Sequence, residues 1–174
     1  MKKRLLITLI SAFSGFIFLS GQTPVNLRCE HLTNPLGIDS PTPRLSWMID
    51  DSREGAAQTA YQIFVSENPD DVADNRGNIW NSQRVGSDEI LATYAGNELK
   101  PFTRYYWKVN VWDKDGAMAS SEVNFFETGV MNIKNWKGAW IGDGRDIHYK
   151  PAPYFRKVFE SNKTIKSMKI GFIF

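Results

Sequence analysis

Cysteine and histidine are scarce in this sequence, and their scarcity excludes several classes of site. Cys29 is the one cysteine among 174 residues, so no disulfide can form within the chain and no zinc site can be built from cysteines. His31 and His148 are the only imidazoles, and they lie more than a hundred residues apart without a second ligand at metal-binding spacing. We therefore predict no metal site and no cofactor, and we expect Cys29 to be a buried small apolar residue.

Neither sign of charge is in clear excess. The chain has 21 basic and 19 acidic residues, and three of the basic ones, Lys2, Lys3 and Arg4, precede an apolar stretch that we expect to be removed. The remainder then holds 18 basic and 19 acidic residues. Nucleic-acid binding needs a basic patch, so we expect no nucleic-acid partner. A serine-hydrolase elbow is missing as well, and Gly142-x-Gly144 does not extend to a dinucleotide motif.

The N-terminus has the pattern of a secretory signal peptide. Residues 1–4 are cationic, residues 5–19 are mostly apolar, and the small residues Ser20 and Gly21 follow. A retained anchor is the alternative, although a full membrane span needs about 20 apolar residues. We expect a leader over residues 1–21 and export to the periplasm, the cell surface or the medium. Contact with a membrane would then occur only through the leader, before cleavage.

Short runs of alternating apolar residues follow the leader at intervals of ten to fifteen residues. This pattern predicts an all-β fold, an immunoglobulin-like antiparallel β-sandwich of about seven strands. In residues 99–113 the period of two places Tyr105, Trp107 and Val109 on one core face, and in the first strand we expect Val25 and Cys29 to share a face. One helical turn is possible over residues 69–73. The expected strands are residues 25–32, 44–49, 60–66, 79–85, 90–94, 99–113 and 123–128.

The pattern also predicts the domain organisation. Residues 22–129 form the sandwich, residues 130–135 form a linker, and residues 136–174 begin a second β-sandwich domain with strands at 136–142, 154–160 and 167–174. Ile170, Phe172 and Phe174 continue the apolar alternation to the last residue, and an apolar strand edge of this kind is an aggregation hazard. We therefore expect the second domain to be incomplete, as in a fragment.

One motif resembles the fibronectin type III pattern. The run from Leu99 through Pro101, Thr103, Tyr105 and Trp107 is similar to the end of that pattern, in which a tyrosine at a strand-entry corner bonds to upstream backbone. Trp47, on an early strand, matches the buried tryptophan of those modules. The resemblance implies the fold and is silent on function.

A second set of segments, which covers nearly everything after the leader, resembles the start of bacterial α-L-rhamnosidases of glycoside hydrolase family 78. The segments are NPLGID (34–39), PRLSW (43–47), YQI (61–63), WNS (80–82), RYYWKV (104–109), WD (112–113), FETG (126–129), WI (140–141) and PYFRK (153–157). The resemblance implies a fibronectin-like domain, then a sandwich of carbohydrate-binding type, then modules leading to an (α/α)6 barrel. That barrel cleaves terminal rhamnose with inversion, using two glutamates, one of them in an Asp-Glu-Arg motif. No such motif occurs here, so no catalytic residue can be assigned and we predict that this chain alone is inactive.

Acidic pairs are the first test of that prediction, because a glycosidase needs two facing carboxyl groups. We expect all of them to be solvated loop acids, and we expect the Asp113-x-Asp115-Gly116 cluster to be a tight turn rather than a calcium loop. The pairs are Asp50-Asp51, Asp70-Asp71, Asp88-Glu89 and Asp113-x-Asp115.

Aromatic side chains are the remaining candidate site. Tyr106 and Trp112 alternate with core residues and are expected to point outward, joined by Trp80, while Trp136 and Trp140 are expected at the seam between the two domains. Our first hypothesis is that these residues contact the remaining domains of a parent rhamnosidase, to which the chain is an accessory scaffold. The alternative is a stand-alone carbohydrate-binding or surface adhesion module that binds a rhamnose-containing glycan.

Overall fold

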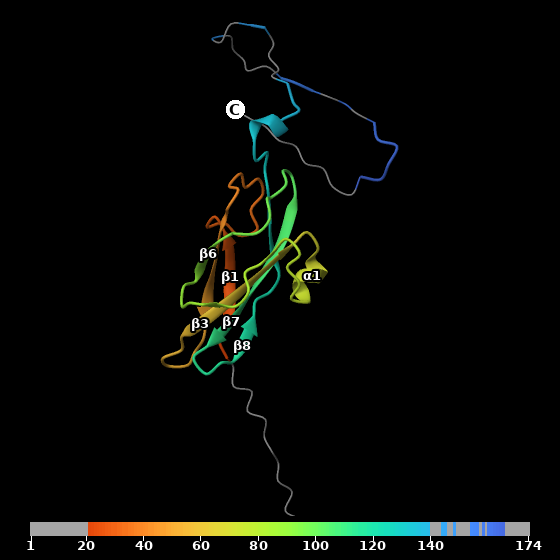
Figure 1. Ribbon diagram of the computed structural model, residues 1–174. Coiled ribbons are helices and arrows are strands. Elements are labelled where there is room, and N and C mark those ends of the chain that lie inside the picture. The colour runs from red at the N-terminus through yellow and green to blue at the C-terminus, as the bar shows by residue number, and fades with distance from the viewer. Residues whose placement is uncertain are drawn as a thin grey trace, which may run out of the picture. The chain divides into compact units, whose positions relative to one another are not determined.

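Two antiparallel β-sheets packed face to face make up most of the part of the chain that the structure describes. The computed structural model describes residues 21–139, 144–145, 148, 154–156, 158 and 160–165 (Figure 1). The chain divides into two units, Met1–Lys137 and Gly138–Phe174. The elements are β1 (Thr23–Cys29), β2 (Arg44–Asp50), β3 (Gln58–Ser66), α1 (Pro69–Ala73), β4 (Trp80–Asn81), β5 (Val85–Gly86), β6 (Leu91–Thr93), β7 (Arg104–Asp113), β8 (Met118–Ser120), β9 (Asn124–Glu127) and the 3-10 turn η1 (Ile133–Asn135).

The pairing of the strands confirms the predicted antiparallel sandwich. The first sheet has the order β1-β2-β6. The second is built on the long pair β3 and β7, with β4 and β5 on the other side of β3 and with β8 and β9 on the other side of β7. The pairings between these strands are all antiparallel.

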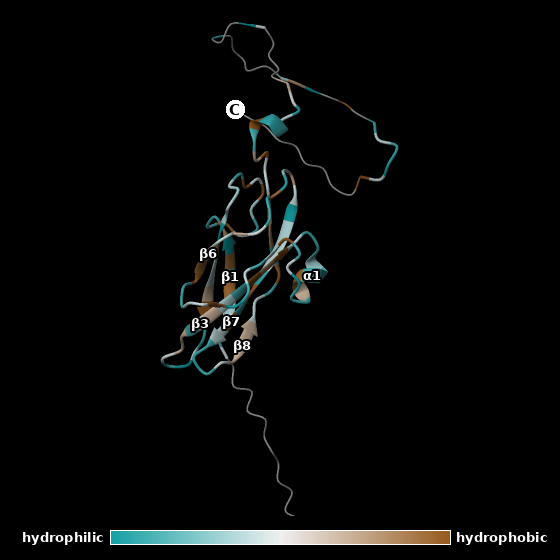
Figure 2. Cartoon of the chain, in the orientation of Figure 1, coloured by the Kyte–Doolittle hydropathy of each residue, from teal (hydrophilic) through white to brown (hydrophobic). Residues whose placement is uncertain are grey.

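The hydrophobic core lies between the two sheets, and Figure 2 shows apolar stretches on strands such as β1 and β6. Trp47 and Trp107 are each 1% exposed, and the Trp47 indole Nε1 donates to Oε1 of the buried Gln58 at 2.9 Å. The expectation of a buried Trp47 is therefore confirmed. Burying an aliphatic side chain such as Leu45 or Val109 contributes about 1.5–3 kcal/mol. The other core residues include Leu27, Cys29, Ile63, Val65, Tyr94, Leu99, Tyr105, Val111 and Phe126.

Tyr105 forms the corner that the fibronectin resemblance implied. Its ring is 1% exposed and stacks on Phe126 with centroids 5.5 Å apart. Its hydroxyl oxygen accepts a hydrogen bond from the backbone N–H of Lys100 at 2.8 Å. This bond closes the turn before β7. Within the turn Phe102 has a positive φ of 53°, and the strand begins only at Arg104. Residues 99–103 therefore belong to the corner and not to the strand, although Leu99 is buried as predicted.

The expected face of the first strand is wrong at Val25. Between Val25 and Arg28 the register of β1 against β2 shifts by one residue, and Asn26 there has a φ of 52°. An extra residue in one strand reverses the alternation of side chains beyond it. Leu27 and Cys29 consequently point into the core, whereas Val25 is 36% exposed.

Two further strand predictions need correction. The stretch 79–85, expected as one strand, is broken into β4 and β5 because Gln83 has a φ of 56° and the Ser82 hydroxyl accepts the Ile63 N–H in place of a backbone carbonyl. Strand β8 was not predicted, because its three residues are too short to show an alternation. Of the three strands expected after the linker, the described residues 136–139, 154–156, 158 and 160 form none, and the other positions of those stretches lie outside the described residues.

The predicted helical turn over residues 69–73 is present as α1 and covers the outer face of the second sheet. Asn68 caps it by accepting the Asp70 N–H on its side chain at 3.1 Å, and Val72 is completely buried. From β7, Lys108 Nζ donates to the carbonyl oxygen of Ala73 at 2.8 Å. The outer face of this sheet is thus occupied in its middle and open only toward its ends.

Candidate functional site

The acidic residues are the first place to look for hydrolytic chemistry, and two of them are not solvated as predicted. The side chains of Asp51 and Asp113 are only 2% and 1% exposed. Arg53 donates from Nη2 to Asp51 Oδ2 at 2.6 Å and to Asp113 Oδ2 at 2.9 Å. The expectation of solvated loop acids failed for both residues, because Arg53, two residues from Asp51 and 60 residues from Asp113, screens both carboxylates from water.

This arrangement holds the two carboxyl groups in their charged form. Hydrogen bonds from Arg53 lower the pKa of both Asp51 and Asp113. A general acid in glycoside hydrolysis needs the opposite, a pKa raised toward neutrality. Asp113 also accepts the backbone N–H groups of Asp115 and Ala117 on Oδ1, at 2.9 Å and 2.8 Å. The predicted tight turn is confirmed, and the pair Asp51 and Asp113 is structural.

The structure brings two of the predicted aromatic residues onto one sheet face. In the β3–β7 pair, Tyr106 lies opposite Ser66 and Trp112 lies opposite Ala60, while the alternate residues of β7 face the core. Both side chains are half-buried. Helix α1 and the turn after it pack between them, with Ala73 bonded to Lys108 and Asn75 bonded to Asn110. They therefore belong to separate patches and do not form one continuous platform.

Both patches carry a guanidinium group on an aromatic ring. Arg84 Cζ lies 4.7 Å from the centre of the Trp112 ring, and Arg104 Cζ lies 4.2 Å from the centre of the Phe125 ring beside Tyr106. Such cation–π contacts occupy one face of each ring. A sugar that stacks on the ring of Trp112 or Phe125 would therefore have only the other face of that ring.

Trp80 points to the other side of the second sheet. It pairs with the core residue Val65, and directly opposite residues of paired strands project to the same face. Its ring packs edge-on against Tyr94, with centroids 5.1 Å apart. Alternation could not predict this orientation in a strand of two residues. Trp136 is half-buried directly after η1, and Trp140 lies outside the described residues.

Sequence reasoning missed the segment by which the chain leaves the sandwich. We call residues 127–136 the exit segment. Its first residues are bonded to the loop 34–39: Gly129 N–H donates to the Ile38 carbonyl at 2.9 Å, and Met131 N–H donates to Asp39 Oδ1 at 2.7 Å. A Cβ at Gly129 would lie 2.6 Å from Asp39 Oδ1, so only glycine fits. The signal was present in NPLGID and FETG, the two motifs that meet here.

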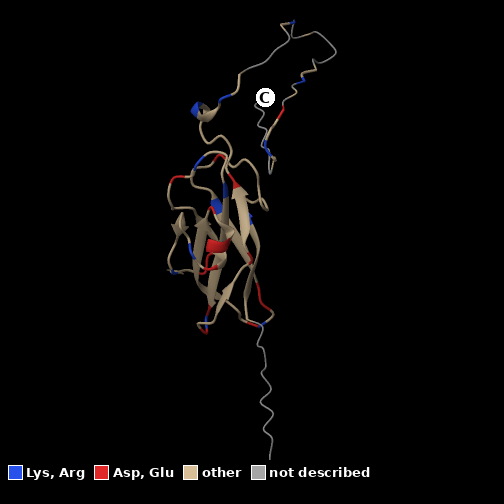
Figure 3. Cartoon of the chain, turned by 90° about the vertical axis from the view of Figure 1, so that its right-hand side faces the viewer, with Lys and Arg blue, Asp and Glu red and all other residues tan. Residues whose placement is uncertain are grey.

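Exposed apolar side chains lie in the exit segment and in the two loops bonded to it. Leu36, in the loop 34–39, is 70% exposed, and Ile133, in η1, is 71% exposed. Phe102 is 43% exposed, and its N–H donates to the Gly129 carbonyl at 2.9 Å. We call these three residues the exit surface; Figure 1 shows the chain leaving one end of the sandwich toward η1. Figure 3 shows residues of both charge signs in the loops at the two ends.

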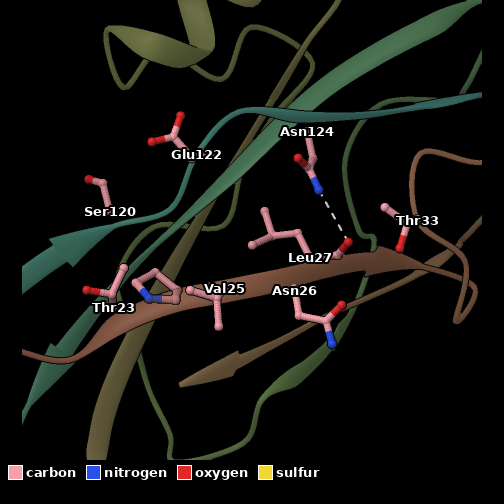
Figure 4. Close-up of a pocket in the computed structure, with 9 residues that line it drawn as sticks. Thr23, Val25, Asn26, Leu27, Thr33, Ser120, Glu122 and Asn124 are labelled. Carbon is pink, nitrogen blue, oxygen red and sulfur yellow. Dashed lines mark hydrogen bonds between the residues drawn. The ribbon is translucent and has the colours of Figure 1, made fainter. Parts of the chain in front are cut away.

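A groove with both polar and apolar lining residues lies along the free edge of β1, between the two sheets (Figure 4). It has a volume of about 240 Å³. Asn124 Nδ2 donates to the Leu27 carbonyl at 3.3 Å and so links the two sides of the groove. The side chain of Glu122, which also lines the groove, is exposed. The groove is lined by Thr23, Pro24, Val25, Asn26, Leu27, Thr33, Ser120, Glu122 and Asn124.

Among the described residues, no three side chains of histidine, cysteine, aspartate or glutamate cluster as metal ligands. Cys29 is buried as predicted, and burial raises the pKa of its thiol to about 12. In the same part of the chain, no helix combines the length and the apolar character of a membrane span.

Comparison with known proteins gives the family. Residues 24–132 match the model of the Rha78A-like N-terminal immunoglobulin domain. The α-L-rhamnosidase of Streptomyces avermitilis is 40% identical over 114 residues, which cover 64% of this chain and 11% of that protein. An α-L-rhamnosidase of Formosa agariphila is 33% identical over 162 residues, which cover 79% of this chain and 17% of that protein. The chain therefore spans less than a fifth of the length of these two relatives.

Two solved structures agree with this result. The α-L-rhamnosidase from Dictyoglumus thermophilum has a TM-score of 0.64 and 43% identity, over 66% of this chain and 13% of that one. The Streptomyces avermitilis enzyme complexed with L-rhamnose has a TM-score of 0.66 and 37% identity, over 70% of this chain and 12% of that one. The similarity to the start of α-L-rhamnosidases that the motifs predicted is confirmed. Through its N-terminal immunoglobulin domain, the chain belongs to the Rha78A-like family.

Proposed function

We propose that this chain is the exported, non-catalytic N-terminal part of an α-L-rhamnosidase, whose parent enzyme hydrolyses terminal α-L-rhamnosides with inversion. The observation that carries the proposal is the extent of the match: most of the chain aligns, but with only 11% to 17% of proteins described as α-L-rhamnosidases. The family model that it matches is an N-terminal domain. The catalytic (α/α)6 domain would be supplied by the parent.

The buried acids support the non-catalytic role. Asp51 and Asp113 share one guanidinium group, which lowers the pKa of both carboxyl groups. Inverting hydrolysis needs one protonated acid and one free base about 6.5–9.5 Å apart, with room for water between them. A pair held together by an intervening arginine meets neither requirement.

The exit segment supports a scaffold role. Because its backbone is bonded to the loop 34–39, the sandwich fixes the direction in which the chain continues past Met131. The exit surface places three apolar side chains around that point. Clustered exposed apolar side chains mark contact sites. We infer that the exit surface, more than the outer face with Tyr106 and Trp112, contacts another domain of the parent enzyme.

The leader supports export. A cationic start, an apolar stretch and small residues at positions 20 and 21 are the features of a secretory signal peptide. Cleavage after Gly21 would release the chain to the periplasm, the cell surface or the medium. Rhamnose-bearing glycans are a class of substrate that a parent enzyme would meet there.

An activity assay tests the non-catalytic role. Purified residues 22–174 are incubated with an aryl α-L-rhamnoside beside the Streptomyces avermitilis enzyme, which shows that the assay works. We expect no release of the aryl group above the blank. Turnover that remains with the protein through successive purification steps would contradict the proposal.

A graft tests the scaffold role. The matched segment of the Streptomyces avermitilis enzyme is replaced by the corresponding residues of this chain, and thermal unfolding of the graft is followed by calorimetry. Phe102→Ser and Leu36→Ser should lower the unfolding temperature of the graft more than that of the isolated sandwich. The control is Met118→Ser, which removes an exposed apolar residue, 53% exposed, from the distant β8. If the two substitutions lowered the unfolding temperatures of the graft and of the isolated sandwich equally, contact through the exit surface would be contradicted.

A second candidate function is carbohydrate binding, which the groove along β1 favours. Hydroxyl, amide and carboxylate groups line it, and these groups bond to sugar hydroxyls. Titration of the chain with L-rhamnose, followed by amide NMR shifts, would detect binding at Ser120 and Asn124. Glu122→Ala should abolish the shifts while Glu98→Ala, an exposed acid elsewhere, leaves them. If no amide signal shifted at millimolar L-rhamnose, carbohydrate binding in the groove would be contradicted.

A further inference from the structure

Gln22 stands out because its side chain is buried and unsatisfied. It directly precedes β1 and is 1% exposed. Neither Oε1 nor Nε2 of its carboxamide has a hydrogen-bond partner among the described residues, and no other buried side chain in that part of the chain has an unpartnered polar atom. The buried Gln58, by contrast, bonds to Trp47 and to two backbone carbonyls. Buried polar groups are almost always hydrogen-bonded, so this exception requires an explanation.

The explanation that we offer rests on the proposed export. Cleavage of the leader after Gly21 would make Gln22 the first residue of the exported chain. That residue would then carry a charged α-ammonium group next to a buried side chain. Together, the ammonium and the carboxamide would bring five N–H bonds to one buried position, where the carboxamide already finds no partner. A charge and several donors at such a place are unfavourable.

We propose that Gln22 is the site of a covalent modification, the closure of the exported N-terminus to pyroglutamate. The neutral α-amine of Gln22 attacks its own side-chain carbonyl carbon Cδ, and a new Nα–Cδ bond closes a five-membered lactam. The Cδ–Nε2 bond breaks, one proton passes from Nα to the departing nitrogen, and ammonia leaves. No atom changes its oxidation state, and no second reactant is consumed. An α-amino group has a pKa of about 7.7–8.0, so part of it is neutral near pH 7.

The product suits the buried position better than the reactant. The lactam keeps one carbonyl oxygen and one N–H, has no charge and has lost the amino group of the carboxamide. The modified residue therefore presents one donor where the unmodified N-terminus presents five. Because folding buries Cδ, the ring closes on the newly cleaved chain before β1 joins its sheet. Folding then protects the closed ring from reopening.

Mass spectrometry of the natural N-terminus tests the inference. The full chain is isolated from the envelope and the medium of the bacterium that encodes it, and it is digested with trypsin, which releases residues 22–28 because Arg28 is the first basic residue after the leader. An isotope-labelled synthetic peptide of the same seven residues, with a free amine, is added at lysis to report ring closure during handling. We expect the natural peptide to be lighter by one ammonia, to a much larger fraction than the labelled standard. Digestion with pyroglutamyl aminopeptidase should remove its first residue.

The other outcomes separate this inference from the proposal of export. A peptide that begins at Gln22 with a free amine would overturn the modification and leave export intact. A chain that begins at another residue, or that retains its leader, would overturn both the modification and the cleavage position. As a control, the Gln22→Asn variant expressed in the same bacterium cannot close a five-membered ring onto its own α-amine, because its side chain is one carbon shorter. It should begin at position 22 with a free amine, and a blocked α-amine in this variant would also contradict the assignment.

Discussion

Arg53 and Asp113, which are 60 residues apart in the sequence, meet across the end of the sandwich with Nη2 and Oδ2 at 2.9 Å. The same Nη2 is 2.6 Å from Asp51, which follows the last residue of β2. Asp113 is the last residue of β7. One guanidinium group thus links the end of a strand in the first sheet to the end of a strand in the second.

This link predicts a specific loss of stability in acid. The pKa of both Asp51 and Asp113 is lowered in the folded chain, chiefly by the hydrogen bonds from Arg53. A carboxyl group with a lowered folded pKa stabilises the fold above its unfolded pKa, about 3.9, and this stabilisation is lost as the pH falls through the folded pKa. Urea unfolding between pH 7 and pH 3 should therefore show a free energy of unfolding that drops below about pH 4.

Arg53→Gln provides the test of that assignment. The variant should be less stable at pH 7 and should show a weaker drop in acid, because its two carboxyl groups have lost the donor that lowers their pKa. The matched control is Arg76→Gln, since Arg76 is 54% exposed and pairs with Asp71 at 2.8 Å on the surface. An exposed pair of this kind contributes little to stability. The same acid dependence in Arg53→Gln and the wild type would contradict the link.

Gly129→Ala should destabilise the sandwich for lack of space. The added methyl group would lie 2.6 Å from Asp39 Oδ1 and 3.1 Å from the Gly37 carbonyl oxygen, so the loop 34–39 would have to move. Overpacking of this kind costs about 1–3 kcal/mol, to be measured by urea unfolding of the full chain. Gly86→Ala in β5 is the control, because no atom lies within 4 Å of its Cβ position. Equal stability of the two variants would show that the exit segment tolerates the shift.

Tyr105→Phe isolates the hydrogen bond of the corner. The ring remains to stack on Phe126, but the Lys100 N–H loses its acceptor. We expect a loss of about 0.5–1.5 kcal/mol in the free energy of unfolding. Tyr154→Phe removes the hydroxyl of a residue that is 88% exposed and should change nothing. If Tyr105→Phe also left the free energy of unfolding unchanged, the stability of the corner would not depend on the Tyr105 hydroxyl.

Cys29 should be unreactive in the folded chain. Burial, with a smaller effect from the charge of Glu30, raises the pKa of the thiol to about 12. Because the thiolate is the reactive form and an unperturbed thiol has a pKa of about 8.5, labelling at pH 8 should be slower by a factor on the order of 10³. A thiol-specific reagent should label the chain only in urea. Rapid labelling of the native chain would mean that the end of β1 opens readily.

The fold could be predicted where one strand carries enough alternation to be unambiguous. Strand β7, with Tyr105, Trp107 and Val109 at a period of two, has the predicted core face and the predicted end, although it begins at Arg104, and the antiparallel sandwich follows from several runs of this kind. Prediction failed where backbone with positive φ interrupts a run. Asn26 reverses the exposure of Val25, and Gln83 divides one expected strand into β4 and β5. Neither residue type alone specifies such a conformation.

The site was less predictable because its contacts are tertiary. Alternation placed Tyr106 and Trp112 away from the core, but it could not reveal that α1 lies between them or that Arg84 covers a ring face. The burial of Asp51 likewise depends on Arg53 reaching a second carboxylate far away in sequence. Gly129 and Asp39 stood in two quoted motifs, yet only the fold shows that those motifs touch.

The extra residue at Asn26 has a consequence for how the molecule behaves beside its own copies. Strand β1 is the last strand of its sheet, and its outer N–H and C=O groups could in principle template a strand from another molecule. The bulge breaks the even spacing of those groups and sharpens the local twist. A strand from another molecule could hydrogen-bond to the outer N–H and C=O groups on one side of Asn26 but not on both sides. The edge of β1 is therefore a poor template for stacking into fibres.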